Sequence, residues 1–190
     1  MSSEDVVKGA DGARAGHSRI GGSEAAPSSP LAIAKRTLTF GNFFSTLGNV
    51  LASGRVLITA LFRPKTSAAL REKVFLGVTS VSDCRYCSWG HSHWALAHGV
   101  SLEEVNRILG QQIESLQARN PAEAAAILFA QHYAEHLERF DPESIENLRQ
   151  FYDVRQVSEI LGYVRLITLG NLIGNTVDAL LGRFRQRVSL

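Results

Sequence analysis

The segment SDCRYCSWGHSHWALAHG, residues 82–99, holds a helix signal and both cysteines of the chain. Ser82 or Asp83 can cap the start of a helix, because short polar side chains accept hydrogen bonds from the first free backbone N–H groups. Gly99 can end the same helix, since glycine tolerates the left-handed conformation that often follows the last turn. The segment therefore predicts one short helix that begins after Ser82 or Asp83 and ends before Gly99.

On that helix, Cys84, Cys87 and His91 are spaced three and four residues apart, so their side chains share one face. Unpaired N–H groups in the first turn carry partial positive charge, which stabilises a thiolate and lowers the pKa of a thiol. Side chains three apart have Cβ atoms about 5–6 Å apart. A disulfide needs about 3.5–4.5 Å, so modest adjustment would close it. His91 could take the proton of Cys87, and the three residues predict a nucleophile, a resolving thiol and a base.

Zinc is a competing interpretation, with both cysteines, His91 and His93 as four ligands. His93 follows His91 by two residues, which turns it about 200° around the helix, away from the other three. A fourth ligand would then come from elsewhere in the fold, such as His132 or His136. Otherwise we expect His93, His132 and His136 to be surface or interface residues. A third interpretation is that both cysteines are simply buried structural residues.

The remainder of the chain from residue 31 onward also favours helices. Residues 31–61 carry apolar side chains at spacings of three and four, which predicts one or two amphipathic helices. Further helix starts are indicated at Ser67, Ser101, Asn120-Pro121, Asp141-Pro142 and Asp153. No run alternates as a strand would. The sequence predicts an all-α fold, a compact multi-helix domain of about six to eight helices.

Composition indicates one globular domain with an N-terminal tail. The chain has 190 residues, of which 45% are hydrophobic and 20% charged, as is ordinary for a soluble globule. The formal net charge of +2 is too small to indicate a nucleic-acid partner. Residues 1–30 lack aromatic side chains and are rich in Gly, Ser and Ala, so we expect a disordered tail there and a single helical domain over residues 31–190.

Targeting signals are not expected. The first residues include Glu4, Asp5 and Asp11 and show no apolar core typical of a signal peptide. Residues 166–177 are uncharged but too short to span a membrane, and residues 37–54 are diluted with polar residues and glycine. We therefore expect a soluble cytoplasmic protein without a membrane partner. In a reducing compartment, a close cysteine pair is typical of catalysis or metal binding rather than of a structural disulfide.

The wider context resembles a known family. Glu72 stands twelve residues before Cys84, and three residues separate the second cysteine from His91. Gly99, the helix start at residues 100–104 and the closing run at residues 171–175 complete the pattern. Over roughly residues 60–180, the chain resembles the alkylhydroperoxidase D and carboxymuconolactone decarboxylase family.

That resemblance implies roles for four residues and an activity. Cys87 corresponds to the peroxidatic cysteine, Cys84 to the resolving cysteine, and His91 with Glu72 to the proton relay. The implied enzyme is a peroxiredoxin-like alkylhydroperoxidase that reduces hydroperoxides without a metal or flavin cofactor. It would require a dithiol reductant, either a lipoylated or a thioredoxin-like protein. The resemblance also implies a homo-oligomer, a trimer or hexamer, for which the apolar residues 40–61 are a candidate contact.

Two features leave alternatives open. Tyr86 stands between the cysteines, where some peroxidases of the family carry a histidine, so a thiol–disulfide oxidoreductase or redox sensor is an alternative. A lyase of the carboxymuconolactone decarboxylase type is another, although that branch does not depend on a cysteine pair. A non-catalytic helical scaffold is the third. Arg71 and Lys73 flank Glu72, a pattern that by itself fits an exposed charged face.

Overall fold

The computed structural model describes residues 35–136 and 142–188, with side chains described as far as residue 184. Secondary structure in these ranges is helical throughout. In chain order the helices are α1 (Phe40–Ala52), α2 (Gly54–Phe62), α3 (Ala68–Ser82), α4 (Arg85–Ala97), α5 (Leu102–Leu109), α6 (Glu114–Arg119), α7 (Pro121–Glu135), α8 (Pro142–Arg149) and α9 (Val154–Val188). The all-α prediction is confirmed.

The described ranges hold nine helices, more than the six to eight predicted. The chain bends at Ser53, which divides the first amphipathic region into α1 and α2. The short α6 precedes α7 and has no side-chain cap at its start, which is why the capping signals did not reveal it. The predicted tail, residues 1–30, lies outside the described residues.

Most predicted helix starts are confirmed by their capping bonds. Ser67, Ser101 and Asn120 each accept a hydrogen bond from the backbone N–H three residues later, at 3.0, 3.2 and 3.2 Å. Asp153 Oδ1 accepts from the N–H of Gln156 at 2.8 Å, and Gln156 Oε1 accepts from the N–H of Asp153 at 3.0 Å. Such reciprocal caps satisfy groups that a helix end would otherwise leave unpaired.

Helix α3 lies at the centre of the fold and carries Glu72. All eight of its residues from 72 to 79 are buried, and α3 packs against α4, α5, α7 and α9. Val74 and Val78 belong to a core cluster shared with α7 and α9, whereas Leu76 belongs to a second cluster shared with α4, α5 and α7. Gly77 permits a close approach of α7, because a Cβ there would lie 3.2 Å from the carbonyl oxygen of Ile127. A helix enclosed in this way is a rigid base for a site.

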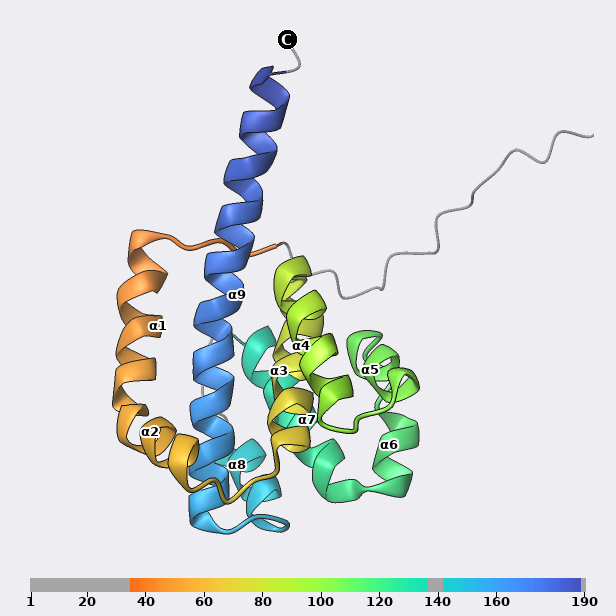
Figure 1. The fold of residues 1–190 in the computed structure, drawn as a ribbon. Coiled ribbons are helices and arrows are strands. Elements are labelled where there is room, and N and C mark those ends of the chain that lie inside the picture. Colours follow the sequence, from red (N-terminus) through yellow and green to blue (C-terminus); the bar gives the residue numbers. More distant parts are fainter. Residues whose placement is uncertain (1–34, 137–141, 189–190) are drawn as a thin grey trace, which may run out of the picture.

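Helix α9 is the longest element and connects the two halves of the molecule. In Figure 1 it runs between α1 with α2 on one side and α3 with α4 on the other, and its C-terminal end projects beyond them. Near its start, the carboxylate of Glu159, 1% exposed, accepts hydrogen bonds from the backbone N–H groups of Lys65 and Thr66 and from the Thr66 hydroxyl. These bonds fix the loop that leads into α3.

The expectation that no stretch is apolar enough to span a membrane is wrong for α9 by length and composition. Val154–Phe184 contains an 18-residue window with a mean hydropathy of 1.2, and 44% of that window is buried. Residues 166–177 alone are too short to span a membrane, whereas α9 continues past the charges that bound them. The helices α1 and α2, which are bent by 51° relative to each other, are together also long and apolar enough if they are counted as one span. Core helices of soluble proteins also pass it, and α9 packs against α1, α2, α3 and α4.

Candidate active site

The junction between α3 and α4 places the two cysteines. Asp83 ends α3 in the left-handed conformation, with φ of 50°, and Cys84 then adopts extended backbone as the N-cap of α4. The predicted cap, Ser82 or Asp83, is therefore wrong by one or two positions. The sulfur of Cys84 takes the capping role and accepts a hydrogen bond from the N–H of Cys87 at 3.3 Å. A sulfur at an N-cap faces the positive end of the helix dipole.

The two sulfurs are electrostatically coupled. A hydrogen bond from the Cys87 thiol, assisted by the backbone N–H groups of Cys87 and Tyr86 and by the charge of Lys35, lowers the pKa of Cys84 to about 6 although burial opposes the shift. The same hydrogen bond, together with burial, raises the pKa of Cys87. The hydrogen bond between the sulfurs therefore favours a thiolate at Cys84 and disfavours one at Cys87.

Glu72 and His91 are joined across the α3–α4 interface. His91 Nδ1 lies 2.8 Å from Glu72 Oε2, and Arg71 donates two hydrogen bonds to Glu72 Oε1 at 3.0 and 2.9 Å. Burial alone would raise the pKa of Glu72, but the bonds from His91 and Arg71 outweigh it and lower the pKa. Because the ionised carboxylate accepts from Nδ1, the Nε2 atom of His91 is the nitrogen that can accept a proton.

Glu72 is not part of an exposed charged face, as its basic neighbours suggested. Its side chain is 1% exposed. Lys73 is also buried and pairs with Glu104 at 2.7 Å and Glu123 at 2.5 Å. The two cations that flank Glu72 in sequence thus have different partners, and only Arg71 acts on the Glu72 carboxylate. The sequence did not single out Arg71 for this role.

Aromatic rings hold the His91 imidazole in place. The ring centroid of Phe75 lies 4.6 Å from that of His91. The ring centroid of Trp94 lies 5.3 Å from that of His91, in an edge-to-face arrangement. Cys87 packs against the core cluster that contains Phe75. Tyr86 is exposed, and its hydroxyl accepts a hydrogen bond from Arg85 at 2.8 Å. The residue between the cysteines is therefore turned toward an arginine at the surface.

Helix α9 closes the site from the other side. Asn175 donates from Nδ2 to the carbonyl of Ser82 at 2.9 Å and to that of Arg36 at 3.1 Å, which ties the end of α3 to α9. At the neighbouring position, a Cβ on Gly174 would lie 2.6 Å from the sulfur of Cys84 and 3.5 Å from that of Cys87. The residues 171–175, noticed in the sequence only as a family-like pattern, thus place the cysteine turn against α9.

Two cations meet Asp178 one turn further along α9. Lys35 Nζ lies 2.7 Å from one carboxylate oxygen of Asp178, and Arg85 Nη2 lies 2.6 Å from the other. Arg85 is the first residue of α4, so this contact attaches the start of the cysteine helix to α9. It also brings Lys35 near the cysteine pair, which no local sequence signal indicated.

A cavity of about 470 Å³ lies between α1, α7 and α9. Its lining includes Ser82, Asn171 and Asn175, but among the described residues neither cysteine nor His91 lines it. Asn171 Nδ2 and Asn175 Oδ1 are buried and make no hydrogen bond with the described residues. The cavity is therefore not lined by the thiols or by the His91 imidazole.

The structure separates His93 from the cysteine face. Its Nδ1 donates to the carbonyl of Trp89 at 2.7 Å, its ring lies 4.6 Å from that of Trp89, and both side chains are exposed. Within the described ranges, the group of potential metal-ligating atoms that lie within 4.8 Å of one another is formed instead by His132, Glu135 and His136. Of the residues predicted for the thiol site, Cys84 contacts Cys87 and Glu72 contacts His91.

Comparison of the chain with protein-family models, with curated proteins and with solved structures found no match. The resemblance noted in the sequence therefore stays a prediction.

Replacement of Gly174 by alanine tests the close approach of α9 to the cysteines. Gly to Ala inside a helix normally stabilises by about 0.5–1 kcal/mol. We expect Gly174→Ala to lower the free energy of unfolding instead, by about 1–3 kcal/mol, because the new Cβ would collide with the Cys84 sulfur. Gly170→Ala is the matched control on the same helix, since its Cβ would meet only Ile167 Cδ1 at 3.8 Å. Equal stability of the two variants in urea denaturation would contradict this account.

The coupling of the two sulfurs is tested by thiolate absorbance near 240 nm as a function of pH. Because the pKa of Cys84 is lowered to about 6, thiolate should appear as the pH rises through that value and disappear below it. In Cys87→Ala the donor to Cys84 is lost, and the midpoint should move up toward the ordinary thiol pKa of about 8.5. A wild-type midpoint already near that ordinary value would show that the thiol pair is not coupled in this way.

Proposed function

We propose that this protein is a thiol-dependent peroxidase that reduces hydroperoxides through a disulfide cycle between Cys84 and Cys87. The observation that carries the proposal is a cysteine pair with one stabilised thiolate, on the same helix as a histidine whose Nδ1 is bound by a buried carboxylate. A thiolate is the attacking species in peroxide reduction, and an oriented imidazole can move the protons that the reaction requires. The resemblance to the alkylhydroperoxidase D family points to the same chemistry.

Solvent exposure favours Cys87 as the residue that attacks the peroxide, whereas the lowered pKa of Cys84 favours Cys84. The side chain of Cys84 is 0% exposed, whereas Cys87 is half-buried, so a peroxide reaches Cys87 first. His91 lies one helical turn beyond Cys87 and accepts the first proton that the pair loses. Transfer of the remaining proton from Cys87 to Cys84 then leaves the negative charge on the accessible sulfur.

The steps balance without a metal or flavin. The Cys87 thiolate attacks the distal oxygen of the hydroperoxide, the O–O bond breaks, and Cys87 becomes a sulfenic acid. Protonated His91 supplies the proton that converts the leaving alkoxide into an alcohol. The Cys84 thiol then attacks the sulfenic sulfur, which forms the disulfide and releases water. An external dithiol, lipoylated or thioredoxin-like, reduces the disulfide and is itself oxidised.

Tyr86 supports a second candidate function, a disulfide exchanger or redox sensor. Its hydroxyl is bound by Arg85 at the surface, so it adds no proton carrier beside the thiols. Peroxide reduction then depends on His91 for proton transfer. If His91 serves only to stabilise the thiolate, the same cysteines would exchange with disulfides and react slowly with peroxide.

Peroxide consumption with dihydrolipoamide as reductant tests the proposal. We expect turnover by the wild type and none by Cys87→Ser or Cys84→Ser. Turnover by His91→Ala should fall by about 10²–10⁴-fold, as is usual when a general acid–base residue is removed. Glu72→Gln should lower turnover in the same direction, because a neutral amide oxygen is a weaker acceptor for His91 Nδ1 than the carboxylate is.

His93→Ala is the matched control, since His93 lies on the same helix but binds the Trp89 carbonyl. Its turnover should equal that of the wild type. If the wild type forms the disulfide readily with oxidised dithiols but does not consume peroxide, the exchanger is the correct function and the peroxidase proposal fails.

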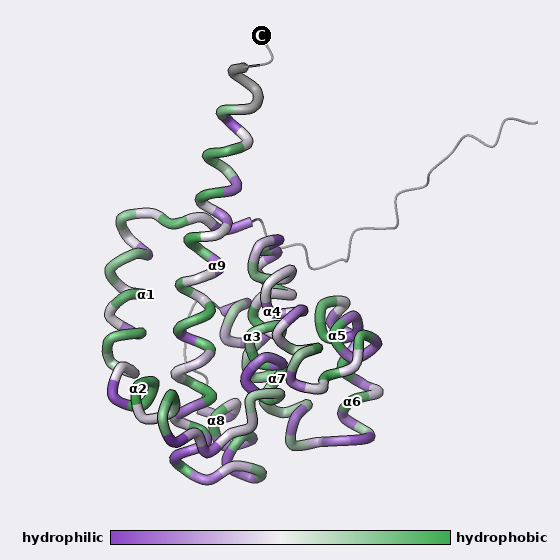
Figure 2. The backbone as a smooth tube through the Cα atoms, in the orientation of Figure 1, coloured by the Kyte–Doolittle hydropathy of each residue, from purple (hydrophilic) through white to green (hydrophobic). Residues whose placement is uncertain are grey.

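We further propose that the protein assembles with copies of itself through the apolar surface of α1, α2 and the projecting part of α9. Hydrophobic segments continue along α1 and into that part of α9 (Figure 2). Exposed large apolar side chains there are Phe40, Phe44, Leu51, Ile58, Leu61, Phe62, Val177, Leu180, Leu181 and Phe184. A surface of this kind is unusual for a monomer and is typical of a subunit contact. The sequence resemblance implies a trimer or hexamer, and the apolar residues 40–61 that it offers as a candidate contact are part of this proposed surface.

Sedimentation equilibrium in detergent-free buffer tests the assembly. We expect a mass that is a multiple of 20.8 kDa for the wild type. Phe62→Glu, at a side chain that is 77% exposed, should shift that mass toward the monomer without unfolding the chain. A wild-type monomer that instead sediments with phospholipid vesicles would overturn the proposal and assign the apolar surface to a membrane.

A further inference from the structure

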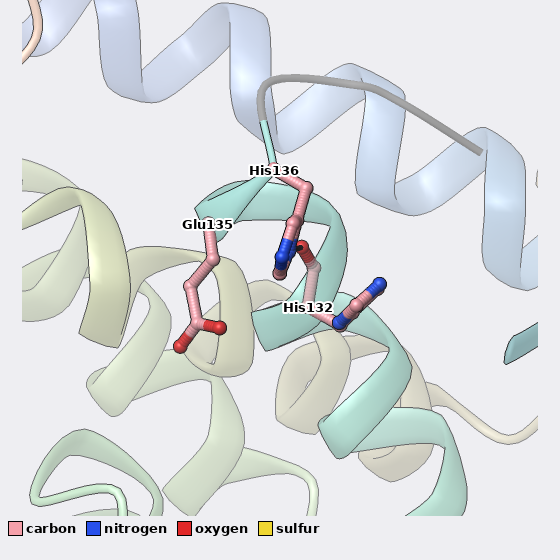
Figure 3. A group of neighbouring side chains, drawn as sticks. All are labelled: His132, Glu135 and His136. Carbon is pink, nitrogen blue, oxygen red and sulfur yellow. Dashed lines mark hydrogen bonds between the residues drawn. The ribbon is translucent and has the colours of Figure 1, made fainter. Parts of the chain in front are cut away.

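A second cluster of chemically active side chains lies in the last turn of α7. Counted from His132, Glu135 follows after three residues and His136 after four. All three side chains therefore lie near one another at the helix end (Figure 3). One potential ligand atom from each lies within 4.8 Å of those of the other two. None of these residues takes part in the proposed peroxidase cycle.

The orientation of His136 is fixed by its own helix. His136 Nδ1 lies 3.0 Å from the carbonyl oxygen of His132. A carbonyl can only accept, so Nδ1 carries the hydrogen and the lone pair of the neutral ring is on Nε2. Metal-binding histidines use this arrangement, in which one ring nitrogen donates to the protein and the other is offered to the metal.

The two imidazoles lie together. Their ring centroids are 4.0 Å apart with an angle of 30° between the planes.

The charge around the cluster suits a cation. The cluster is at the C-terminal end of α7, where the helix dipole is negative. Arg36 donates to the backbone carbonyls of Ala134 and Glu135, at 2.8 and 3.1 Å, and its positive charge offsets part of this negative helix end. The carboxylate of Glu135 brings a negatively charged oxygen donor within 4.8 Å of the potential ligand atoms of the two histidines.

We propose that His132, Glu135 and His136 bind a divalent transition-metal cation of the zinc type. Two imidazoles and one carboxylate form a donor set that zinc accepts, with water completing the coordination. Magnesium and calcium prefer oxygen ligands, so they fit this set poorly. Ligand atoms around tetrahedral zinc are about 3.3 Å apart for bonds of about 2.0 Å. Side-chain rotation at this partly exposed helix end can close the difference from 4.8 Å.

The cluster opens onto a groove. Both His132 and Glu135 line a depression of about 590 Å³ formed by α7 and α8, together with Ser144, Asn147 and Gln150. The metal would therefore keep coordination positions accessible to water or to a small anionic ligand. An accessible position distinguishes a reactive or exchangeable site from a closed structural one.

Calorimetric titration with Zn²⁺ tests the site in the full-length chain. The cysteines are first removed as metal ligands by combining Cys84→Ser with Cys87→Ser, and the disulfide form of the wild type serves as a second background. We expect one zinc per chain in both. His132→Ala and His136→Ala should each weaken binding by at least about tenfold, and Glu135→Gln should weaken it less, because its amide oxygen is a poorer, uncharged donor.

His93→Ala is the control, because it removes an exposed helical histidine that makes the same kind of bond to a backbone carbonyl. It should leave zinc affinity unchanged. Circular dichroism checks that each variant is folded. The proposal is overturned if zinc binds with a Kd weaker than about 1 mM, if the His132 and His136 variants bind as the wild type does, or if binding disappears with the cysteines alone. None of these outcomes depends on peroxidase turnover.

Discussion

The contact between the middle of α9 and the turn that joins α3 to α4 is the constraint on which the thiol site depends. Asn175 donates a hydrogen bond to the carbonyl of Ser82. Gly174 leaves room for the Cys84 sulfur, because a Cβ at this position would lie only 2.6 Å from that sulfur. Because α9 also holds the start of α4 through Asp178 and Arg85, both ends of the short cysteine turn are fixed to one helix. The sulfurs are thus positioned by packing from a segment about 90 residues away.

The second organising feature is that two neighbouring buried charges on α3 bind different charged partners. Glu72 and Lys73 are neighbours in sequence and are both buried, yet they form two independent networks. Glu72 is bound by His91 and Arg71, while Lys73 is bound by Glu104 and Glu123. Buried charges are tolerated when they are paired and hydrogen-bonded. The separation leaves the Glu72–His91 pair intact, so the imidazole on α4 keeps one defined orientation against α3.

The thiol pair and the cluster at the end of α7 both lie where a helix dipole places partial charge, but at opposite ends of a helix. Cys84 is at an N-terminus, where partial positive charge stabilises a thiolate, and the His132, Glu135 and His136 cluster is at a C-terminus, where partial negative charge favours a cation. In both places the side chain is oriented by a bond to backbone of its own helix. The two sites are carried by different helices, so they can be perturbed separately.

Local physical chemistry in the sequence determined the helical class and most helix starts. Capping bonds and helix periodicity act over three or four residues, so they can be recognised from neighbouring letters. The sequence placed the cap of α4 one or two residues too early, because Asp83 ends α3 in the left-handed conformation and leaves Cys84 as the N-cap. Only the tertiary structure decided that Glu72 is buried against His91, that Arg71 shares its carboxylate, and that Gly174 faces the sulfurs. Those contacts join residues that are distant in the chain, and no local pattern encodes which distant helix face will meet another.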